Sequence, residues 1–351
     1  MPGAAFINKI GTALPQHEAH QAFVGWAHRR IRTRREVAVF DRMAGRSGIE
    51  KRWTVLPPAP AGDQTRDGGF YQGDDMPPTS SRMEIYAQSA PDLAMAAVHE
   101  LGALEGITHL VVASCTGFIA PGIDQIVARR LGLASTVERT LVGFMGCYAA
   151  VTALRTARHI SRSEPDARIL VIMVELCSLH LQPEDDLERI LTMLLFGDGA
   201  GAAIVSSEPV GLQMTEVFSS TLTDSSELIG WKIGDLGFEM TLSGAVPARI
   251  AEATAKPEFR ANFGDPQKVD SWAVHAGGRT VLDAVEQGFG LDKQALEISR
   301  DVLRECGNMS SATLMFVLER ILNGGDPVEN GAAIAFGPGL AAEGFRYRRA
   351  E

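Results

Sequence analysis

The fold class is decided by a central stretch in which THLVVASC (108–115), TLVGFM (140–145) and ARILVIMVEL (167–176) are apolar runs of strand length. Between them lie IDQIVARRLGL (123–133) and CYAAVTALRTARHI (147–160), whose apolar residues recur at helical spacing. Continuous apolar strands that alternate with helices are typical of a largely parallel sheet covered by helices on both faces. The sequence therefore predicts an α/β fold.

The same alternation returns nearer the C-terminus, in two strand-like and two helix-like segments. These segments are VDSWAVH (269–275), TVLDAVEQGFG (280–290), SSATLMFVLERILNG (310–324) and AAIAFGPG (332–339). We therefore predict two α/β halves, residues 1–210 and 211–351, that meet near residues 209–213. No linker rich in Gly, Ser or Pro separates them into independent domains.

The N-terminal region supplies further elements before this pattern begins. Residues 5–14 alternate weakly and stop at Pro15, as a first strand does before a turn. Residues 18–46 are rich in Arg and Ala and predict one helical stretch, and residues 83–104 predict another. Between these helices, residues 57–82 are dense in Pro, Gly and Asp and predict a long loop.

Composition narrows the classes of function. The 351 residues include 33 basic and 43 acidic side chains, and a net charge of −10 disfavours a nucleic-acid-binding protein. No stretch approaches the roughly 20 apolar residues of a membrane-spanning helix, and no signal peptide is expected from the first residues. The four cysteines form no C-x-x-C pair, so neither a disulfide framework nor a zinc site is expected. We expect a cytoplasmic, globular, enzyme-sized protein that is not integral to a membrane.

Cys147 lies where a predicted strand gives way to a predicted helix across the single residue Gly146. A thiol at a helix N-terminus lies at the positive end of the helix dipole, which favours the thiolate. Lowering a thiol pKa by about two units needs roughly 3 kcal/mol, which the dipole and a nearby imidazolium together supply. Position alone leaves two interpretations open: a nucleophilic thiol, or the small buried hydrophobe that a free cysteine usually is.

His275 and Asn308 occupy comparable positions. His275 follows a predicted strand and precedes Ala276 and two glycines, at the strand end where α/β sheets bind ligands. Asn308 directly precedes a predicted helix. Each alone has an ordinary interpretation, as a hydrogen-bonded structural histidine and as a turn or helix-capping residue. As a set with Cys147, they are candidates for a nucleophilic site.

Two further segments are candidates for ligand binding. The glycine-rich FGDGAGAA (196–203) follows a helical segment and precedes a strand, the reverse of the dinucleotide-binding order, so tight packing is the better interpretation. The basic residues of the stretch 29–52 stand out in an acidic protein. Such a stretch is usually a solvated helix face, but it also suits an anionic phosphate group at the mouth of a site.

Five local patterns, in this order and spacing, resemble those of the type III polyketide synthases, the chalcone synthase-like group of the thiolase superfamily. They are MGCYAA (145–150), LLFGDGAGAA (194–203), WAVHAGG (272–278), GNMSSA (307–312) and AFGPGL (335–340). The resemblance covers nearly the whole chain and implies the thiolase-like five-layered αβαβα fold from two related halves, in an obligate homodimer. It also implies an acyltransferase whose substrates are coenzyme A thioesters, with no cofactor and no metal.

The resemblance implies a role for each member of the candidate set. Cys147 is then the nucleophile that accepts an acyl group from a coenzyme A thioester. His275 pairs with the thiolate and, with Asn308, holds the thioester carbonyl of malonyl-CoA. Decarboxylation develops enolate charge on that oxygen, and one fixed donor there is worth roughly 3 kcal/mol of barrier. Repeated condensations then build a poly-β-keto chain that cyclises.

The resemblance also assigns substrate-binding positions around this set. Phe196 matches a gating phenylalanine, Met240 replaces a second one, and Arg42 and Arg46 match a basic coenzyme A mouth whose third position carries Val39. The remaining positions, which line the cavity or belong to GNMSSA, are Cys115, Cys177, His180, Trp231 and Ser310. For Cys115 and Cys177, a lining role is favoured over participation in the chemistry.

The lining residues bear on the substrate. SCTGF (114–118) and ELCSLHLQP (175–183) are similar to bacterial members, and Trp231 fills space that plant enzymes leave for an aromatic starter. We expect a long-chain fatty acyl starter, malonyl-CoA as extender, and an alkylpyrone or alkylresorcinol product. The alternatives are a tetrahydroxynaphthalene synthase that uses malonyl-CoA alone, a ketoacyl synthase III of fatty-acid synthesis, and a non-catalytic acyl-CoA binder.

Overall fold

The computed structural model describes residues 3–59, 64–66, 68–72 and 76–350. The predicted loop 57–82 therefore lies partly outside the described residues. The strands are β1 (Phe6–Ala13), β2 (His17–Glu18), β3 (Trp53–Thr54), β4 (His109–Ser114), β5 (Glu138–Gly143), β6 (Ile169–Leu176), β7 (Asp198–Ser206), β8 (Leu212–Thr221), β9 (Ile229–Gly234), β10 (Gly237–Leu242), β11 (Ser271–Val274), β12 (Gly331–Gly337) and β13 (Ala341–Arg349). The helices are α1 (His20–Arg30), α2 (Arg34–Gly45), α3 (Thr79–His99), α4 (Ile123–Arg130), α5 (Ala149–Ser163), α6 (Leu187–Met193), α7 (Val246–Ala255), α8 (Pro257–Arg260), α9 (Arg279–Phe289), α10 (Glu297–Cys306) and α11 (Thr313–Asn323).

In the part of the chain that the structure describes, nine strands form one sheet in the order β11-β12-β13-β8-β1-β7-β6-β4-β5. Its two ends are parallel, since β4 pairs in parallel with β5 and β6, and β11 with β12. Between them, β13, β8, β1 and β7 run antiparallel to their neighbours. The prediction of a largely parallel sheet was therefore wrong, because burial on both faces does not fix the direction of a strand.

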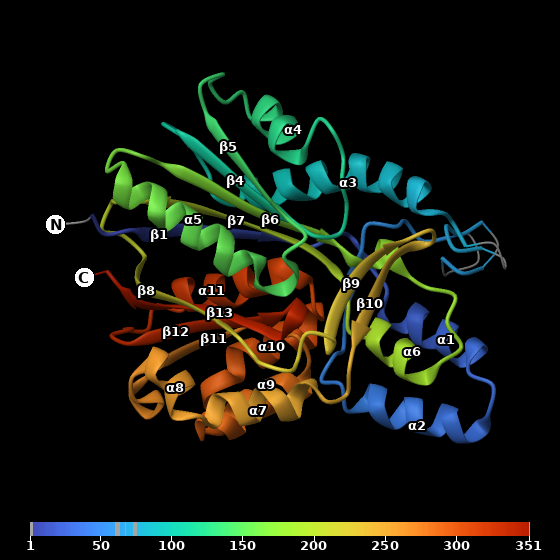
Figure 1. The fold of residues 1–351 in the computed structure, drawn as a ribbon. Coiled ribbons are helices and arrows are strands. Elements are labelled where there is room, and N and C mark those ends of the chain that lie inside the picture. The colour runs from blue at the N-terminus through green and yellow to red at the C-terminus, as the bar shows by residue number, and fades with distance from the viewer. Residues whose placement is uncertain (1–2, 60–63, 67, 73–75, 351) are drawn as a thin grey trace.

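Five layers are stacked through the molecule (Figure 1). Helices α3 and α4 cover the outer face of the β1, β4, β5, β6 and β7 part of the sheet, and α7 and α9 cover the outer face of the other part. Helices α5 and α11 lie between the two parts. This is the αβαβα arrangement expected from the resemblance. The boundary between the predicted halves, at residues 210 and 211, stays a prediction.

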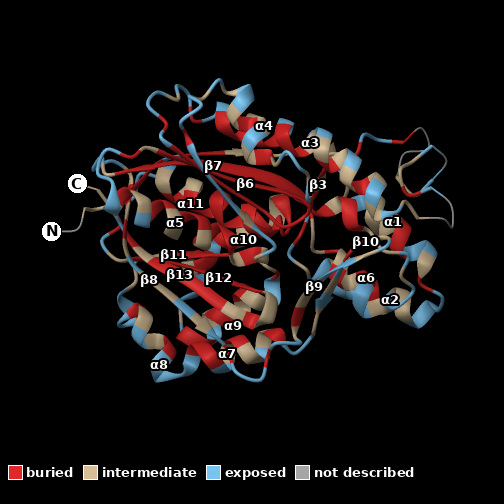
Figure 2. Cartoon of the chain, turned by 45° about the horizontal axis from the view of Figure 1, so that its top comes forward, coloured by how far each residue is buried: buried red, intermediate tan, exposed pale blue. Residues whose placement is uncertain are grey.

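The inner strands of the large sheet are buried along most of their length (Figure 2), and their successive side chains pack into different layers. On β4, Val111 packs into the central cluster with α5 and α11, whereas Val112 packs against α3. On β12, Ala333 faces the central cluster and Ile334 the cluster beneath α9. Such period-two burial on both faces explains why the strands are continuous apolar runs.

Three predicted elements need correction at their ends or in their exposure. The helix predicted over residues 18–46 is two helices, because Thr33 leaves the helical conformation and caps α2 by accepting a hydrogen bond from the Glu36 amide at 3.2 Å. The second predicted helix is α3, which begins four residues before Met83 and ends at His99. The strand predicted at TLVGFM is β5, which lies at the edge of the sheet and is largely exposed.

A peripheral lobe lies beside the layers. It consists of α1, α2 and α6, which share an apolar cluster, and of the hairpin β9–β10 (Figure 1). The short ladder β2–β3 belongs to it as well. Among the helices of the described residues, none is long and apolar enough to cross a membrane. The cytoplasmic location expected from the sequence stays a prediction.

Candidate active site

Cys147 lies at the turn between β5 and α5, within a single 3₁₀ turn, Gly146–Tyr148. The preceding Gly146 has φ +72°, and a Cβ on it would lie 2.4 Å from Cδ of Pro338. Glycine is therefore required there both by conformation and by space. The Cys147 side chain is 7% exposed, so the thiol is enclosed and lies at the start of the helical segment as predicted.

His275 follows β11 and is held by a hydrogen bond from its amide to the carbonyl of Ile334, at 2.9 Å. The residue is 2% exposed, and neither ring nitrogen has a hydrogen-bond partner among the described residues. A buried polar group without a partner costs roughly 1–3 kcal/mol. An imidazole without a partner in the protein can form a hydrogen bond to a bound molecule.

Asn308 connects the turn after His275 to the segment that carries Phe196. Its side-chain Nδ2 donates to the carbonyl of Gly277 at 3.1 Å. Its backbone amide donates to Leu195 at 2.8 Å, and its carbonyl accepts from Gly197 at 3.0 Å. Gly277 lies against the His275 ring, since a Cβ on it would be 3.5 Å from Nε2. Gly277 therefore contacts both the ring of His275 and the side chain of Asn308.

Ser310 completes the contacts of the thiol. It has φ +48°, an unfavourable conformation for a residue other than glycine, and its amide donates to Oδ1 of Asn308 at 2.8 Å. Backbone strain of this kind persists where the surrounding structure fixes it, and it clusters at functional sites. The side chains of Ser310 and Asn308 lie near the thiol of Cys147 and lower its pKa against the effect of burial.

The protonation states differ from the expected thiolate and imidazolium. Burial raises the pKa of Cys147 to about 12, and hydrogen bonds from Ser310 and Asn308 oppose this shift without overcoming it. Burial likewise lowers the pKa of His275 to about 3. Burial therefore acts against the lowered thiol pKa that the sequence predicted, because desolvation outweighs the effect of the single helical turn. Both groups are neutral, and the thiol proton must move when the thiol reacts.

A buried carboxyl group beside the thiol was missed in the sequence. Glu175 is fully buried at the end of β6, and it accepts hydrogen bonds from the amide of Cys115 at 3.0 Å and the hydroxyl of Thr116 at 2.8 Å. The hydroxyl of Ser311 also donates to it. Burial raises the pKa of Glu175 to about 7. The signal was an acidic residue at the end of the continuous apolar run ARILVIMVEL.

Cys115 and Trp231 form a wall next to the thiol. Sγ of Cys115 accepts a hydrogen bond from the amide of Gly146 at 3.0 Å, and its carbonyl accepts one from Nε1 of Trp231, also at 3.0 Å. Across the β9–β10 hairpin, Trp231 lies directly opposite Met240. Burial raises the pKa of Cys115 well above the usual range, and the adjacent Glu175 adds to the shift, so this thiol is protonated.

His180 is a fixed part of the same wall. Its Nδ1 accepts from the amide of Phe238 at 3.0 Å, and its Nε2 lies 2.7 Å from the carbonyl of Thr116. The ring is stacked on Phe238 at 4.2 Å and meets Trp231 edge-on at 5.8 Å. Burial lowers the pKa of His180 to about 3, so the ring is a neutral wall residue with both nitrogens engaged.

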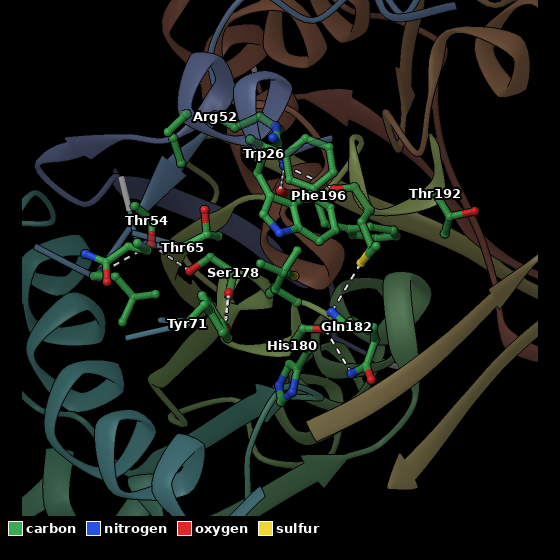
Figure 3. Close-up of a pocket in the computed structure, with 18 of the residues that line it drawn as sticks. Trp26, Arg52, Thr54, Thr65, Tyr71, Ser178, His180, Gln182, Thr192 and Phe196 are labelled. Atoms are coloured by element: carbon green, nitrogen blue, oxygen red, sulfur yellow. Dashed lines mark hydrogen bonds between the residues drawn. The ribbon is translucent and has the colours of Figure 1, made fainter. Parts of the chain in front are cut away.

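A cavity begins at this wall and is shown in Figure 3. Phe196, Met240, Cys177, His180 and Trp231 all line it, so five of the sequence-predicted residues share one space. Burial raises the pKa of Cys177 well above the usual range, and the carboxyl groups of Glu175 and Asp198 add to the shift. The Cys177 thiol is therefore protonated, and it lies near those of Cys147 and Cys115.

Arg42 and Arg46 lie on the exposed surface at the C-terminal end of α2. The carbonyl of Arg46 accepts a hydrogen bond from Arg279 at 3.1 Å, and Arg279 begins α9, four residues after His275. The two arginines therefore lie at the surface end of the turn that carries the histidine. Val39 is partly buried on the same helix.

The glycine-rich segment 196–203 is a packing element, as the sequence favoured. Asp198 is fully buried and accepts hydrogen bonds from the amides of Val55 at 2.9 Å and Ser178 at 2.7 Å, and from the Ser178 hydroxyl at 2.7 Å. A Cβ on Gly199 would lie 2.4 Å from Sδ of Met309. The segment thereby holds the start of β7 against Val55, which follows β3, and against Met309, the neighbour of Asn308.

Two models of one known protein family match the chain. Residues 1–209 match the N-terminal domain of chalcone and stilbene synthases, and residues 213–350 match their C-terminal domain. The chain belongs to the chalcone and stilbene synthase family. It is therefore a type III polyketide synthase, a member of a family of acyltransferases that carry out decarboxylative condensations with malonyl-CoA and acyl-CoA thioesters. This sets aside the ketoacyl synthase III alternative.

Several relatives support this family membership. The alpha-pyrone synthesis polyketide synthase-like Pks18 of Mycobacterium tuberculosis is 32% identical over 287 residues, which cover 76% of this chain and 72% of that protein. The crystal structure of PKS-I from the brown alga Ectocarpus siliculosus is similar with a TM-score of 0.89 at 30% identity, covering 99% of each chain. The C-terminal type III polyketide synthase domain of Steely1 from Dictyostelium has a TM-score of 0.87 at 25% identity, over 99% of this chain and 100% of that chain.

Proposed function

We propose that Cys147 is the nucleophile that carries the growing acyl chain. The single observation that carries this proposal is the meeting of Cys147, Asn308 and Ser310 next to the unpartnered imidazole of His275. As Sγ of Cys147 attacks the thioester carbonyl, its proton passes to His275, the neutral base at the site. The coenzyme A thiolate leaves and takes up a proton, and the acyl group stays on Cys147.

In the condensation step, His275 and Asn308 bind the thioester oxygen of malonyl-CoA. Loss of carbon dioxide leaves an enolate whose charge develops on that oxygen, where Nδ2 of Asn308 and a ring N–H of His275 stabilise it. The enolate carbon then attacks the Cys147 thioester, and the thiolate leaves with the extended chain now on coenzyme A. Arg42 and Arg46 bind the phosphate groups of coenzyme A at the surface.

The starter is a long-chain fatty acyl-CoA and the product an alkylpyrone. Support comes from the wall formed by His180 and Trp231, which occupies the space beside the thiol, and from the apolar side chains of the adjoining cavity. The relative Pks18 carries alpha-pyrone synthesis in its name. In this proposal Phe196 and Met240 gate the cavity, and Cys115 and Cys177 line it without reacting.

The active form is a homodimer. Strand β5 ends the sheet in the described part of the chain, and Leu141 on it is 49% exposed. Beside it, Phe118 and Phe144 are 44% and 36% exposed, with ring centroids 5.5 Å apart. An apolar patch along a free strand edge promotes aggregation or pairing with another chain when it is exposed in a monomer. A second copy of the chain covers it.

Product analysis tests this function. Purified protein is incubated with malonyl-CoA and a series of acyl-CoA starters from short to long chain, and products are identified by mass spectrometry. Triketide or tetraketide pyrones formed with long-chain starters are expected. An aromatic product from malonyl-CoA alone would reassign the enzyme as a tetrahydroxynaphthalene synthase. No condensation with any starter, and no acylation of Cys147, would leave a non-catalytic acyl-CoA binder.

A further inference from the structure

Arg82, in the first turn of α3, is fully buried, and a buried arginine needs partners for its charge. Its Nη1 donates to the carbonyls of Leu179 and Leu181, both at 2.8 Å, and its Nε donates to that of Pro77 at 2.9 Å. The central carbon of the guanidinium lies over the ring of Tyr71, 5.3 Å from its centroid. Three backbone carbonyls and one aromatic ring therefore hold this side chain.

These contacts lie next to both members of one stacked pair of rings. The two carbonyls that share Nη1 belong to the residues on either side of His180. A Cβ on Gly237, which precedes Phe238, would lie 2.7 Å from the same Nη1. Phe238 stacks on His180 at 4.2 Å and donates its amide to Nδ1 of that ring at 3.0 Å. Arg82 therefore fixes the chain beside each ring of the pair.

The start of α3 is attached to the hairpin β9–β10 by a second residue. Oγ1 of Thr79 accepts a hydrogen bond from the amide of Gly237 at 2.8 Å, and the Thr79 amide donates to the carbonyl of Asp235, also at 2.8 Å. Helix α3 itself is packed on the outer face of the sheet. Its first turn therefore gives the hairpin and the segment 179–181 one common attachment.

The stacked pair belongs to the wall of the cavity in Figure 3, which His180 and Phe238 both line. Trp231 meets the two rings edge-on, at 5.8 and 6.0 Å, and its Nε1 donates to the carbonyl of Cys115 beside the thiol. Arg82 is not among the described residues that line this cavity. It can therefore act on a substrate only through the position of the wall.

We infer that Arg82 is a positioning residue that holds the wall formed by His180 and Phe238 and thereby limits the number of malonyl extensions. The inference rests on the proposed function and adds the residue that fixes the space beside Cys147. Burial is the main cause of the lowered pKa of His180, and the charge of Arg82 acts in the same direction. The neutral ring keeps its Nδ1 as an acceptor for the amide of Phe238. Without the guanidinium, the two carbonyls lose their donor and the rings move into the space left, which widens the cavity.

The first test compares Arg82→Ala with Arg260→Ala. Arg260, in α8, is a matched control, because it donates to the carbonyls of Gly288 and Phe289 at 2.9 and 3.2 Å and lies 5.8 Å from the centroid of one aromatic ring. Products formed from malonyl-CoA and hexadecanoyl-CoA are quantified by mass spectrometry. The ratio of tetraketide to triketide is expected to rise by about threefold or more in Arg82→Ala, and to stay at the wild-type value in Arg260→Ala. An unchanged ratio in Arg82→Ala, or an equal rise in both variants, would overturn the inference.

The second test separates positioning from a loss of stability. Reduced stability alone would lower every rate together, because less enzyme is folded, and would leave the product ratio unchanged. The rate of malonyl-CoA decarboxylation per folded enzyme is expected to match the wild type in Arg82→Ala. In the double variant with His180→Ala, the product ratio is expected to equal that of His180→Ala alone, since both changes act on one wall. Independent, additive shifts would show that Arg82 acts elsewhere and would refute its assigned role.

A third variant keeps the inference testable if Arg82→Ala shows no cooperative thermal transition. Arg82→Lys retains the charge, but lysine is one atom shorter than the path to Nη1, so its ammonium does not reach both carbonyls. A rise in the product ratio is again expected, and the wild-type ratio would contradict the inference. Absence of any condensation product from the wild-type protein would instead count against the proposed function, so the two failures are distinguishable.

Discussion

Nδ2 of Asn308 donates a hydrogen bond of 3.1 Å to the carbonyl of Gly277, two residues beyond His275. This bond joins the loop after α10 to the loop after β11. Oδ1 of the same asparagine accepts a hydrogen bond from the amide of Ser310, whose backbone conformation is strained. One amide side chain therefore sets the relative position of the histidine loop and the residues that contact the thiol. Its removal has consequences for both binding and chemistry.

Replacement of Asn308 by alanine is expected to lower the rate of malonyl-CoA decarboxylation by about 10²–10³-fold, because a donor to the developing enolate oxygen is lost. Carbon dioxide release is the measurement. Asn323→Ala, at an exposed site where the amide donates to Glu319, is the matched control and is expected to match the wild type. A wild-type rate in Asn308→Ala would remove Asn308 from the mechanism.

The pH dependence of decarboxylation reports on His275. Burial lowers the pKa of His275 to about 3. The ring therefore stays neutral when the pH falls below about 6.5, the ordinary pKa of a histidine. In the Cys147→Ala variant, which removes the thiol, decarboxylation is therefore expected to be constant between about pH 5.5 and 8. A rate that changes with a midpoint near 6.5 would show that the histidine titrates in the site.

Asp198 tests the role of the glycine-rich segment in stability. Asp198→Asn replaces one acceptor oxygen by an amide that faces the buried donors of Val55 and Ser178. A loss of roughly 1–3 kcal/mol in the free energy of unfolding is expected. Urea unfolding at neutral pH measures it. Asp166→Asn, at an exposed position, serves as the control, and equal midpoints in the two variants would contradict the assigned role.

The exposed strand edge tests the homodimer. Leu141→Arg adds a charge to the patch formed with Phe118 and Phe144, and is expected to convert a dimer to a monomer in light scattering after gel filtration. Val210→Arg is a matched control, because Val210 is 51% exposed in a turn distant in sequence from the patch. A dimer that survives Leu141→Arg would place the interface elsewhere.

Much of the architecture was predictable because buried strands and helices have recognisable patterns of apolar residues. Strands such as β4 and β6 read as continuous apolar runs, and the helices between them show regular apolar spacing. What the sequence did not predict depends on contacts distant in the chain. The antiparallel course of β1 and β8 is set by the paths of their connections, and the exposure of β5 by its place at the sheet edge.

The site was predicted by position and family resemblance, not by its electrostatics. Cys147 was placed correctly at a strand-to-helix turn, but its pKa depends on how completely the chain encloses it. Glu175 was overlooked because a single acidic residue in an apolar run has no local partner in sequence. Its partners Thr116 and Ser311 come from two other loops. Enclosure and such partnerships arise only when the chain is folded.

The most direct test of the central claim is peptide mapping of the protein after brief incubation with hexadecanoyl-CoA and no malonyl-CoA. The account predicts one acylated peptide, the one that contains Cys147, and no acylation in Cys147→Ala. Cys306→Ala, which removes a buried thiol of α10, is expected to be acylated as the wild type is. Acylation that persists in Cys147→Ala, on Cys115 or Cys177, would contradict the account.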